Sequence, residues 1–113
     1  MRAADDAELI APGDLHVGAH VEASLLLTPD DAELPILVTP STEGDAVAVV
    51  QGRLTRADAD VLDDGRLRFR IPLVANTAGT GVLHVRVESF ACAARCRPTV
   101  RRLRTLLTVN ANR

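Results

Sequence analysis

The sequence predicts an all-β fold, an immunoglobulin-like antiparallel sandwich of six to seven strands. Three observations support this prediction. Short segments alternate apolar and polar residues with a period of two, turn residues separate them, and no segment has the period of an amphipathic helix. Only two of the 113 residues, Phe69 and Phe90, are aromatic, so the core must consist of Val, Leu, Ile and Ala. A small closed barrel is the alternative architecture.

The domain boundaries follow changes in composition along the chain. Residues 1–14 resemble a loose leader, residues 15–109 are predicted to form the sandwich, and residues 110–113 form a polar tail. No apolar run approaches the roughly 18 residues of a membrane span, and the leader lacks the apolar stretch of a signal peptide. We therefore expect no membrane span. A cytoplasmic location and the removal of a signal or a preceding domain remain alternatives.

The first half contains three predicted strands. Residues 15–27 alternate and end at a Thr-Pro-Asp-Asp turn, and residues 35–39 form a short apolar strand closed by Pro40 and a polar loop. Residues 46–54 begin with a continuous apolar run, which is typical of a strand covered on both faces. Residues 55–64 are expected to form one helical turn or a loop, ending at an Asp-Asp-Gly turn.

The second half has the clearest alternation. In residues 66–74, four apolar side chains point one way and three arginines point the other. Residues 82–91 and 99–109 are predicted to be the last two strands. The expected core positions are Leu67, Phe69, Ile71, Leu73, Leu83, Val85, Val87, Leu103 and Leu107.

Two cysteines form the most informative local motif. Cys92 and Cys96 would lie about 13 Å apart on one extended strand, whereas a disulfide needs Cα atoms within about 7 Å. A strand enters at Phe90 and another leaves after Pro98, which favours a hairpin with a three-residue loop between the cysteines. The leading interpretation is a disulfide that staples this hairpin. It would place the protein in an oxidising compartment, the periplasm or outside the cell.

Other interpretations of the cysteine pair stay open. Both thiols could be reduced and structural, or they could form a redox-active pair whose thiolates Arg95 and Arg97 favour. Dinuclear copper centres with this cysteine spacing need a His where Val100 stands and a nearby Met, but the only methionine is Met1. We therefore expect no metal and no cofactor.

The charges are distributed unevenly. All thirteen basic residues are arginine, which indicates the coding bias of a GC-rich bacterial genome. Residues 1–65 carry fourteen acids and three arginines, whereas residues 66–113 carry ten arginines and one Glu. Acidic strands and loops beside basic ones would neutralise each other. The alternative is an arginine face that holds an anionic partner; its candidate residues are Arg66, Arg68, Arg70, Arg86, Arg102 and Arg104.

Catalytic and metal-binding motifs are not evident in the sequence. None of the three serines sits in a Gly-x-Ser-x-Gly elbow. His16 and His20 are expected on one face of one strand, about 13 Å apart, which is too far to share an ion. His84 is also expected at the surface. The scarcity of aromatic residues argues against a nucleic-acid partner, since single strands bind by stacking on rings.

The second half also resembles a known family. Residues 64–73 (DGRLRFRIPL), residues 81–87 (GVLHVRV) and the motif Phe90-x-Cys92-x3-Cys96 are similar to the C-terminal β-sandwich of bacterial thioredoxin-like proteins with NHL repeats. In outline they are also similar to the N-terminal immunoglobulin-like domain of periplasmic thiol:disulfide interchange proteins. The resemblance implies an accessory sandwich that packs against other domains or partners, with Cys92 and Cys96 paired.

Three functional hypotheses follow. The first is a non-catalytic accessory module that binds or packs against another protein or domain. The second is a thiol–disulfide exchange domain that uses Cys92 and Cys96. The third is a binder of anions or envelope polymers that uses the arginine face.

Overall fold

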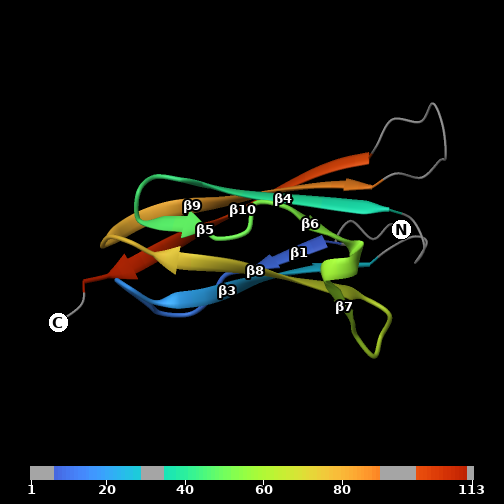
Figure 1. The fold of residues 1–113 in the computed structure, drawn as a ribbon, viewed down its shortest axis with the longest axis horizontal. Helices are drawn as coiled ribbons and strands as arrows, with labels where there is room; N and C mark the ends of the chain where they lie inside the picture. The colour runs from blue at the N-terminus through green and yellow to red at the C-terminus, as the bar shows by residue number, and fades with distance from the viewer. Residues whose placement is uncertain (1–6, 29–34, 90–98, 112–113) are drawn as a thin grey trace.

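Two β-sheets packed face to face form the molecule (Figure 1). The computed structural model describes residues 7–28, 35–89 and 99–111. Almost all strand pairs are antiparallel; the exception is the short pair of β2 with β10. The predicted immunoglobulin-like sandwich is confirmed.

The first sheet has the strand order β1-β3-β8-β5, and β7 also pairs with β8. Strand β8 is therefore the centre of this sheet, with β3 along its length on one side and the two short strands β5 and β7 on the other. The bounds are β1 (Ala7–Ile10), β3 (His20–Leu27), β5 (Val47–Val49), β7 (Ala59–Val61) and β8 (Leu67–Ala75).

The second sheet has the strand order β2-β10-β9-β4-β6. Its two longest strands, β9 and β10, pair antiparallel over eleven residue pairs, from Thr99 opposite Ser89 to Val109 opposite Gly79. The bounds are β2 (Leu15–His16), β4 (Ile36–Glu43), β6 (Leu54–Thr55), β9 (Gly79–Ser89) and β10 (Thr99–Asn110).

The predicted strand 15–27 is divided between the two sheets. Gly18 has a φ of +92°, a conformation that glycine adopts without steric cost, and the chain turns there from β2 into β3. Two backbone hydrogen bonds connect this turn to Ala75 at the end of β8. Gly18 N donates to Ala75 O (2.8 Å), and Ala75 N donates to Ala19 O (2.9 Å). The apolar positions keep their alternation across the turn, so local patterning could not reveal the change of sheet.

The predicted strand 46–54 is divided in the same way. Strand β5 pairs with β8 in the first sheet, and β6 pairs with β4 in the second. The expectation that the apolar run is covered on both faces is wrong at Val50, which is 60% exposed. Val50 still donates its backbone N–H to Pro72 O of β8 (2.9 Å), but no described element covers its side chain before the chain crosses to the other layer.

Strand β4 is longer than predicted because it continues through Pro40. Strand β6 pairs only with Leu37 and Val38, so beyond these residues β4 has β9 as its one neighbour. A proline, which has no backbone N–H, is tolerated on such an edge. Pro40 is buried, and the polar residues after it extend the strand to the turn at Gly44 (φ +94°).

Of the two alternatives for residues 55–64, a helical turn or a loop, the structure has the helical turn, the 3-10 helix η1 (Arg56–Asp58), followed directly by strand β7. The Asp58 carboxylate accepts a hydrogen bond from the Thr55 backbone N–H (2.8 Å), which satisfies one of the donors at the start of the helix. The predicted Asp-Asp-Gly turn is also confirmed, with Gly65 at φ +90°. This turn sends the chain from β7 back along its neighbour β8.

The core lies between the sheets and is entirely apolar among the described residues. The alternation predicted for residues 66–74 and 82–91 is confirmed as far as the structure describes these residues, up to Ser89, since every predicted apolar position in β8 and β9 is buried. Leu103 on β10 is only partly buried at the margin of the core. The largest fully buried side chain is Phe69, at the middle of the sandwich.

We expect Phe69→Ala to cost about 3–5 kcal/mol of unfolding free energy, because it leaves a cavity that close-packed neighbours cannot fill. Urea denaturation followed by circular dichroism measures this cost. Since Phe69→Ala could unfold a marginally stable domain, Ile71→Val provides a milder variant, with an expected cost of about 0.5–1.5 kcal/mol. The exposed control Val61→Ala should change stability by less than about 0.5 kcal/mol. Equal effects of Ile71→Val and Val61→Ala would contradict the assigned core.

Candidate functional site

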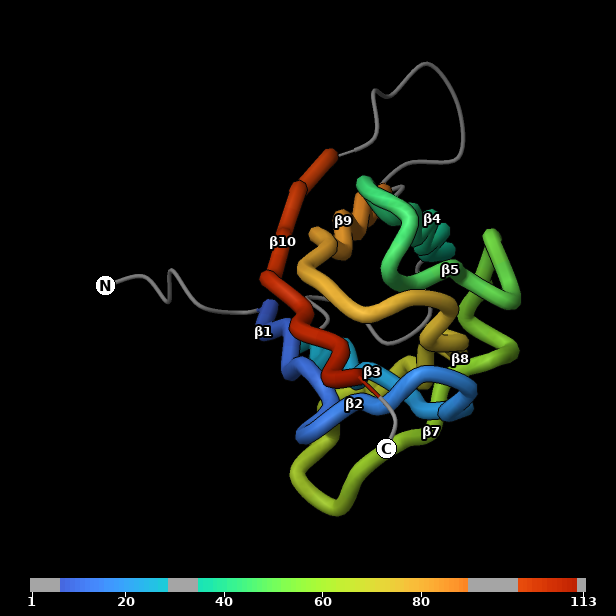
Figure 2. Tube along the Cα trace, turned by 90° about the vertical axis from the view of Figure 1, so that its left-hand side faces the viewer, coloured from blue at the N-terminus to red at the C-terminus, as the bar shows by residue number. Residues whose placement is uncertain are grey.

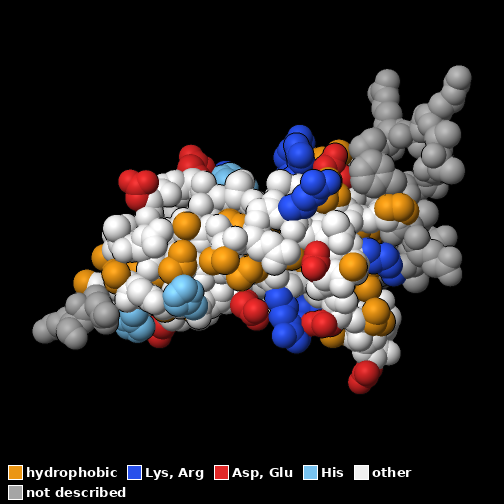
Figure 3. Space-filling view, in the orientation of Figure 1, with side chains coloured by type: hydrophobic (Ala, Val, Ile, Leu, Met, Phe, Trp, Pro, Cys, Tyr) orange, Lys and Arg blue, Asp and Glu red, His pale blue; other side chains and the backbone are white. Residues whose placement is uncertain are grey.

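The structure divides the six candidate arginines between two surfaces. Arg66, Arg68 and Arg70, the β8 arginine row, lie on the outer side of the first sheet, whereas Arg86 on β9 and two arginines of β10 lie on the outer side of the second. Because the inner faces are buried against each other, the outer faces point in opposite directions. Basic side chains accordingly gather along both the upper and the lower side in Figure 3. The single face predicted from the sequence is therefore two faces.

The β8 arginine row is paired with acids from the first half of the chain. Arg66 Nε lies 2.7 Å from Asp64 Oδ2. Asp60 Oδ2 lies 3.0 Å from Arg70 Nε and 3.5 Å from Arg68 Nη2. This arrangement confirms, for this surface, that acidic elements neutralise basic ones. Such solvent-exposed pairs contribute little to stability, so their main consequence is that these charges are already compensated within the chain.

Strand β7 supplies Asp60, the carboxylate shared by two arginines. The β7–β8 register places Asp60 directly opposite Arg68 on the outer side of the sheet. The sequence analysis missed this residue because it expected a helical turn or a loop across residues 55–64. The only local signal was an acid at an alternating position between two apolar residues, Ala59 and Val61.

Asp64 has a pKa below its ordinary value of 3.8. The main cause is the backbone N–H of Arg66, which donates to Asp64 Oδ1 at 3.1 Å, followed by the Arg66 side chain, whose Nε donates to Oδ2 at 2.7 Å. Both contacts favour the ionised carboxylate. They close the turn that leads into β8.

The second surface, the β10 arginine patch, consists of Arg86, Arg102 and Arg104. Arg102 lies directly opposite Arg86 in the β9–β10 ladder, and Arg104 lies opposite His84. Like charges directly opposite each other on a sheet are destabilising. Arg86 has a neighbour of opposite charge in Glu88, at 3.6 Å.

Arg102 and Arg104 form no ion pair within the described part of the chain. Both side chains are exposed. Since Glu88 is the one carboxylate paired with any of the three arginines in the described part of the chain, the patch keeps a net positive charge. The β10 arginine patch is therefore less neutralised than the β8 arginine row.

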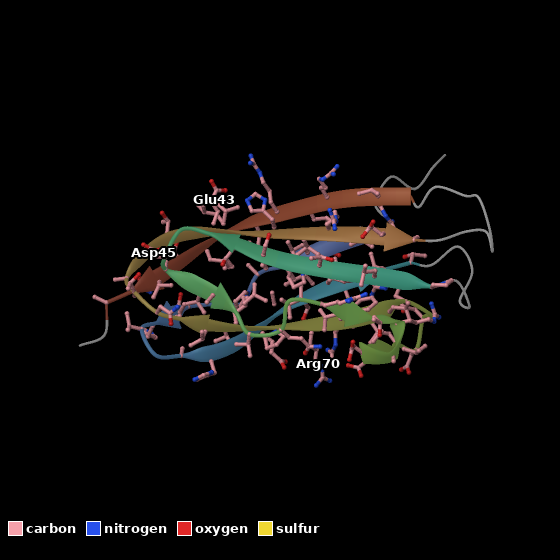
Figure 4. All side chains as sticks on the ribbon, turned by 45° about the horizontal axis from the view of Figure 1, so that its top comes forward. Glu43, Asp45 and Arg70 are labelled. Carbon is pink, nitrogen blue, oxygen red and sulfur yellow. The ribbon has the colours of Figure 1, made fainter. Side chains whose placement is uncertain are left out.

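His84 pairs with Glu43 on the outer side of the second sheet. His84 Nε2 lies 2.9 Å from Glu43 Oε1, across the β4–β9 ladder. Figure 4 shows Glu43 and Arg70 on opposite outer sides of the sandwich. On the β9 side of the β10 arginine patch, Glu43 is thus paired with His84 and Glu88 with Arg86.

The other two histidines do not share a face. His16 belongs to β2 in the second sheet and His20 to β3 in the first, so the prediction that one strand carries both is wrong. The turn at Gly18 is the reason. Among the described residues, no three His, Cys, Asp or Glu side chains gather as a metal site would require.

The predicted cysteine pair, Cys92 and Cys96, lies outside the described residues. The flanking strands are described, and their pairing extends up to Ser89 opposite Thr99. No helix in the described parts of the chain is long and apolar enough to cross a membrane.

Architecture and register define this chain as an immunoglobulin-like β-sandwich domain. It is similar to a crystal structure of native alpha-2-macroglobulin from Escherichia coli, spanning domain MG7 to the C-terminus (TM-score 0.66, 19% identity, 93% of this chain and 16% of that chain). It is also similar to a cryo-EM reconstruction of the native conformation of the same protein (TM-score 0.64, 19% identity, 93% and 6%). No family model and no curated protein matches.

Because both identities are 19%, the likeness establishes the fold and not an activity. The chain spans a small part of each of these macroglobulin chains. The immunoglobulin-like sandwich expected from the sequence resemblance is confirmed, whereas neither structure tests the likeness to thioredoxin-like or interchange proteins.

The low pKa of Asp64 predicts a pH-dependent contribution to stability. A carboxyl whose pKa is lower in the folded state stabilises the protein above the unfolded pKa, and the contribution is lost as the pH falls through the folded pKa. The unfolding free energy of the wild type should therefore exceed that of Asp64→Asn at pH 7, and the difference should decline below about pH 4. Urea denaturation across pH 2–7 measures it. Asp63→Asn, in the same turn, is the control; an equal pH-dependent difference there would contradict the assignment.

Proposed function

We propose that this chain is a non-catalytic accessory module that binds, or packs against, an acidic surface of another protein or domain. The β10 arginine patch carries this proposal. Its exposed Arg102 and Arg104 have no acidic partner among the described residues, whereas the arginines of the opposite surface do. Arg102 lies opposite Arg86, and this repulsion between like charges reduces the stability of the isolated domain. A partner that carries carboxylates would remove that cost.

The architecture supports a module without catalytic residues. Catalytic acids and bases commonly depend on burial to tune their proton affinity, and the described core contains no buried polar side chain. The likeness to short stretches of large macroglobulin chains supports an accessory domain in a longer protein. The resemblance to C-terminal sandwiches of thioredoxin-like proteins with NHL repeats supports the same role.

Arginine chemistry favours carboxylate groups as the ligand. The planar guanidinium presents paired N–H donors that match a carboxylate in two-point hydrogen bonding. Arg102 and Arg104 are two residues apart on one strand, so their Cα atoms are about 7 Å apart. Alternate carboxylates on an extended acidic segment have the same spacing. An acidic envelope polymer shares the carboxylate chemistry and is the second candidate.

The proposal predicts retention of the protein on a carboxylated matrix at low salt. Because the net charge is −2, retention needs a local positive surface. Arg102→Ala combined with Arg104→Ala should elute at a clearly lower salt concentration than wild type. Arg68→Ala combined with Arg70→Ala is the matched control, since it changes the net charge by the same amount, and it should elute later than the β10 double variant. Equal elution of the two double variants would contradict the proposal.

We also propose that Cys92 and Cys96 form a structural disulfide in the β9–β10 hairpin. Support comes from the register of the described strands. In every pair of the ladder, from Val109 with Gly79 to Thr99 with Ser89, the two residue numbers add to the same value, and Cys92 with Cys96 adds to that value too. Cα atoms directly opposite in an antiparallel ladder are about 4.5–5.5 Å apart, within the range of about 4.4–6.8 Å that disulfides require.

The disulfide is tested by counting thiols in protein exported to a bacterial periplasm and purified without reductant. Alkylation in denaturant should add no label, and alkylation after reduction should add two labels by intact mass. A Cys92→Ser, Cys96→Ser variant should lose no more than about 2 kcal/mol, because the closed loop is short. Two labels without reductant would contradict the proposal. Ready equilibration with glutathione would favour the thiol-exchange alternative, since structural disulfides have potentials below about −300 mV.

A further inference from the structure

Strand β10 has a long open edge. Strand β9 pairs with it along one side, but on the other side β2 pairs only with Val109 and Asn110. Residues 100–108 therefore have no strand on that side within the described part of the chain. In Figure 2 the first part of β10 runs along the outside of the molecule, and β1 of the other sheet also lies close to β10. In such an edge, every second residue directs its N–H and C=O away from the sheet, where they are available to another strand.

The outward side chains along this edge follow a simple pattern. At alternate positions they are Val100, Arg102, Arg104 and Leu106, that is, an apolar residue, two cations and an apolar residue, followed by Thr108. The two apolar members are solvent-exposed, 40% for Val100 and 64% for Leu106. This edge therefore presents backbone groups that no described strand pairs with, beside a defined order of outward side chains.

A second copy of this chain fits the edge poorly. Two β10 edges paired antiparallel would bring Arg102 and Arg104 of both copies together on one outer face. Four cations at cross-strand distances of about 5 Å repel each other. The charges thus protect the edge from self-association, as charged residues do on natural edge strands, but they do not oppose a strand of opposite charge.

We propose that the open edge of β10 receives an extended acidic segment of a partner protein as an additional strand. This proposal rests on the proposed function, since it uses Arg102 and Arg104 of the same patch and names the partner's conformation. Backbone hydrogen bonds to residues 100–108 hold the segment, and its side chains provide the specificity. On the outer face, the alternate residues of the partner segment are apolar, acidic, acidic and apolar. Its carboxylates then face the two arginines, and its apolar side chains cover Val100 and Leu106.

The test uses a fluorescein-labelled nine-residue peptide with the sequence Thr-Val-Thr-Glu-Thr-Glu-Thr-Val-Thr. Fluorescence anisotropy at low salt should show saturable binding to the wild type and about tenfold weaker binding to the Arg102→Ala, Arg104→Ala variant. The Arg68→Ala, Arg70→Ala variant should bind like the wild type. Two control peptides, one with lysine replacing glutamate and one with valine and glutamate exchanged, should bind at least tenfold more weakly.

Amide hydrogen exchange separates strand addition from simple charge attraction. On saturation with the acidic peptide, alternate amides within residues 100–108 should exchange more slowly. Peptide binding that depends on the arginines but leaves these amides unchanged would overturn this inference while the proposed function stands. Absence of peptide binding, with retention on the carboxylated matrix intact, would do the same. Loss of that retention would instead remove the proposed function and this inference together.

Discussion

The burial of two apolar sheet faces against each other is the constraint on which the rest of this structure depends. Strands β8 and β9 are central to the two sheets, and every second side chain of each is buried in one shared core. Since the pleat alternates strictly, the remaining side chains of β8 and β9 must point to solvent on opposite sides of the molecule. The arrangement of charge on the surface is therefore a consequence of the core, and two arginine surfaces arise where the sequence suggested one.

The two surfaces differ because their neighbours differ. In the first sheet, the short strand β7 returns alongside β8 and places Asp60 between Arg68 and Arg70. In the second sheet, Arg102 and Arg104 of β10 lie opposite Arg86 and His84, and no described strand beyond residues 100–108 supplies an acid. The same kind of side chain is thus paired with acids in one layer and lacks a described acidic partner in the other.

The β9–β10 ladder links the proposals made for this protein. Its uniform register supports the pairing of Cys92 with Cys96 at one end of the hairpin. A covalent link there would hold β10 beside β9, because no described strand pairs with the other side of β10 over residues 100–108. The arginines discourage pairing with an identical edge, and the same charges favour an acidic strand. Stability, resistance to self-association and recognition would then depend on one hairpin.

The sequence by itself determined the class of fold, the inward and outward residues of β8 and β9 and the turn at Gly65, and it left a helical turn or a loop open for residues 55–64. These features depend on a period of two or on residues a few positions apart, which local chemistry sets. Only the tertiary structure decided which sheet each strand joins. The changes of layer at Gly18 and after Val49, and the separation of Arg68 from Arg102, depend on which distant strands pair. Alternation is identical in either sheet, so residues far apart in the chain had to be brought together before the surfaces were defined.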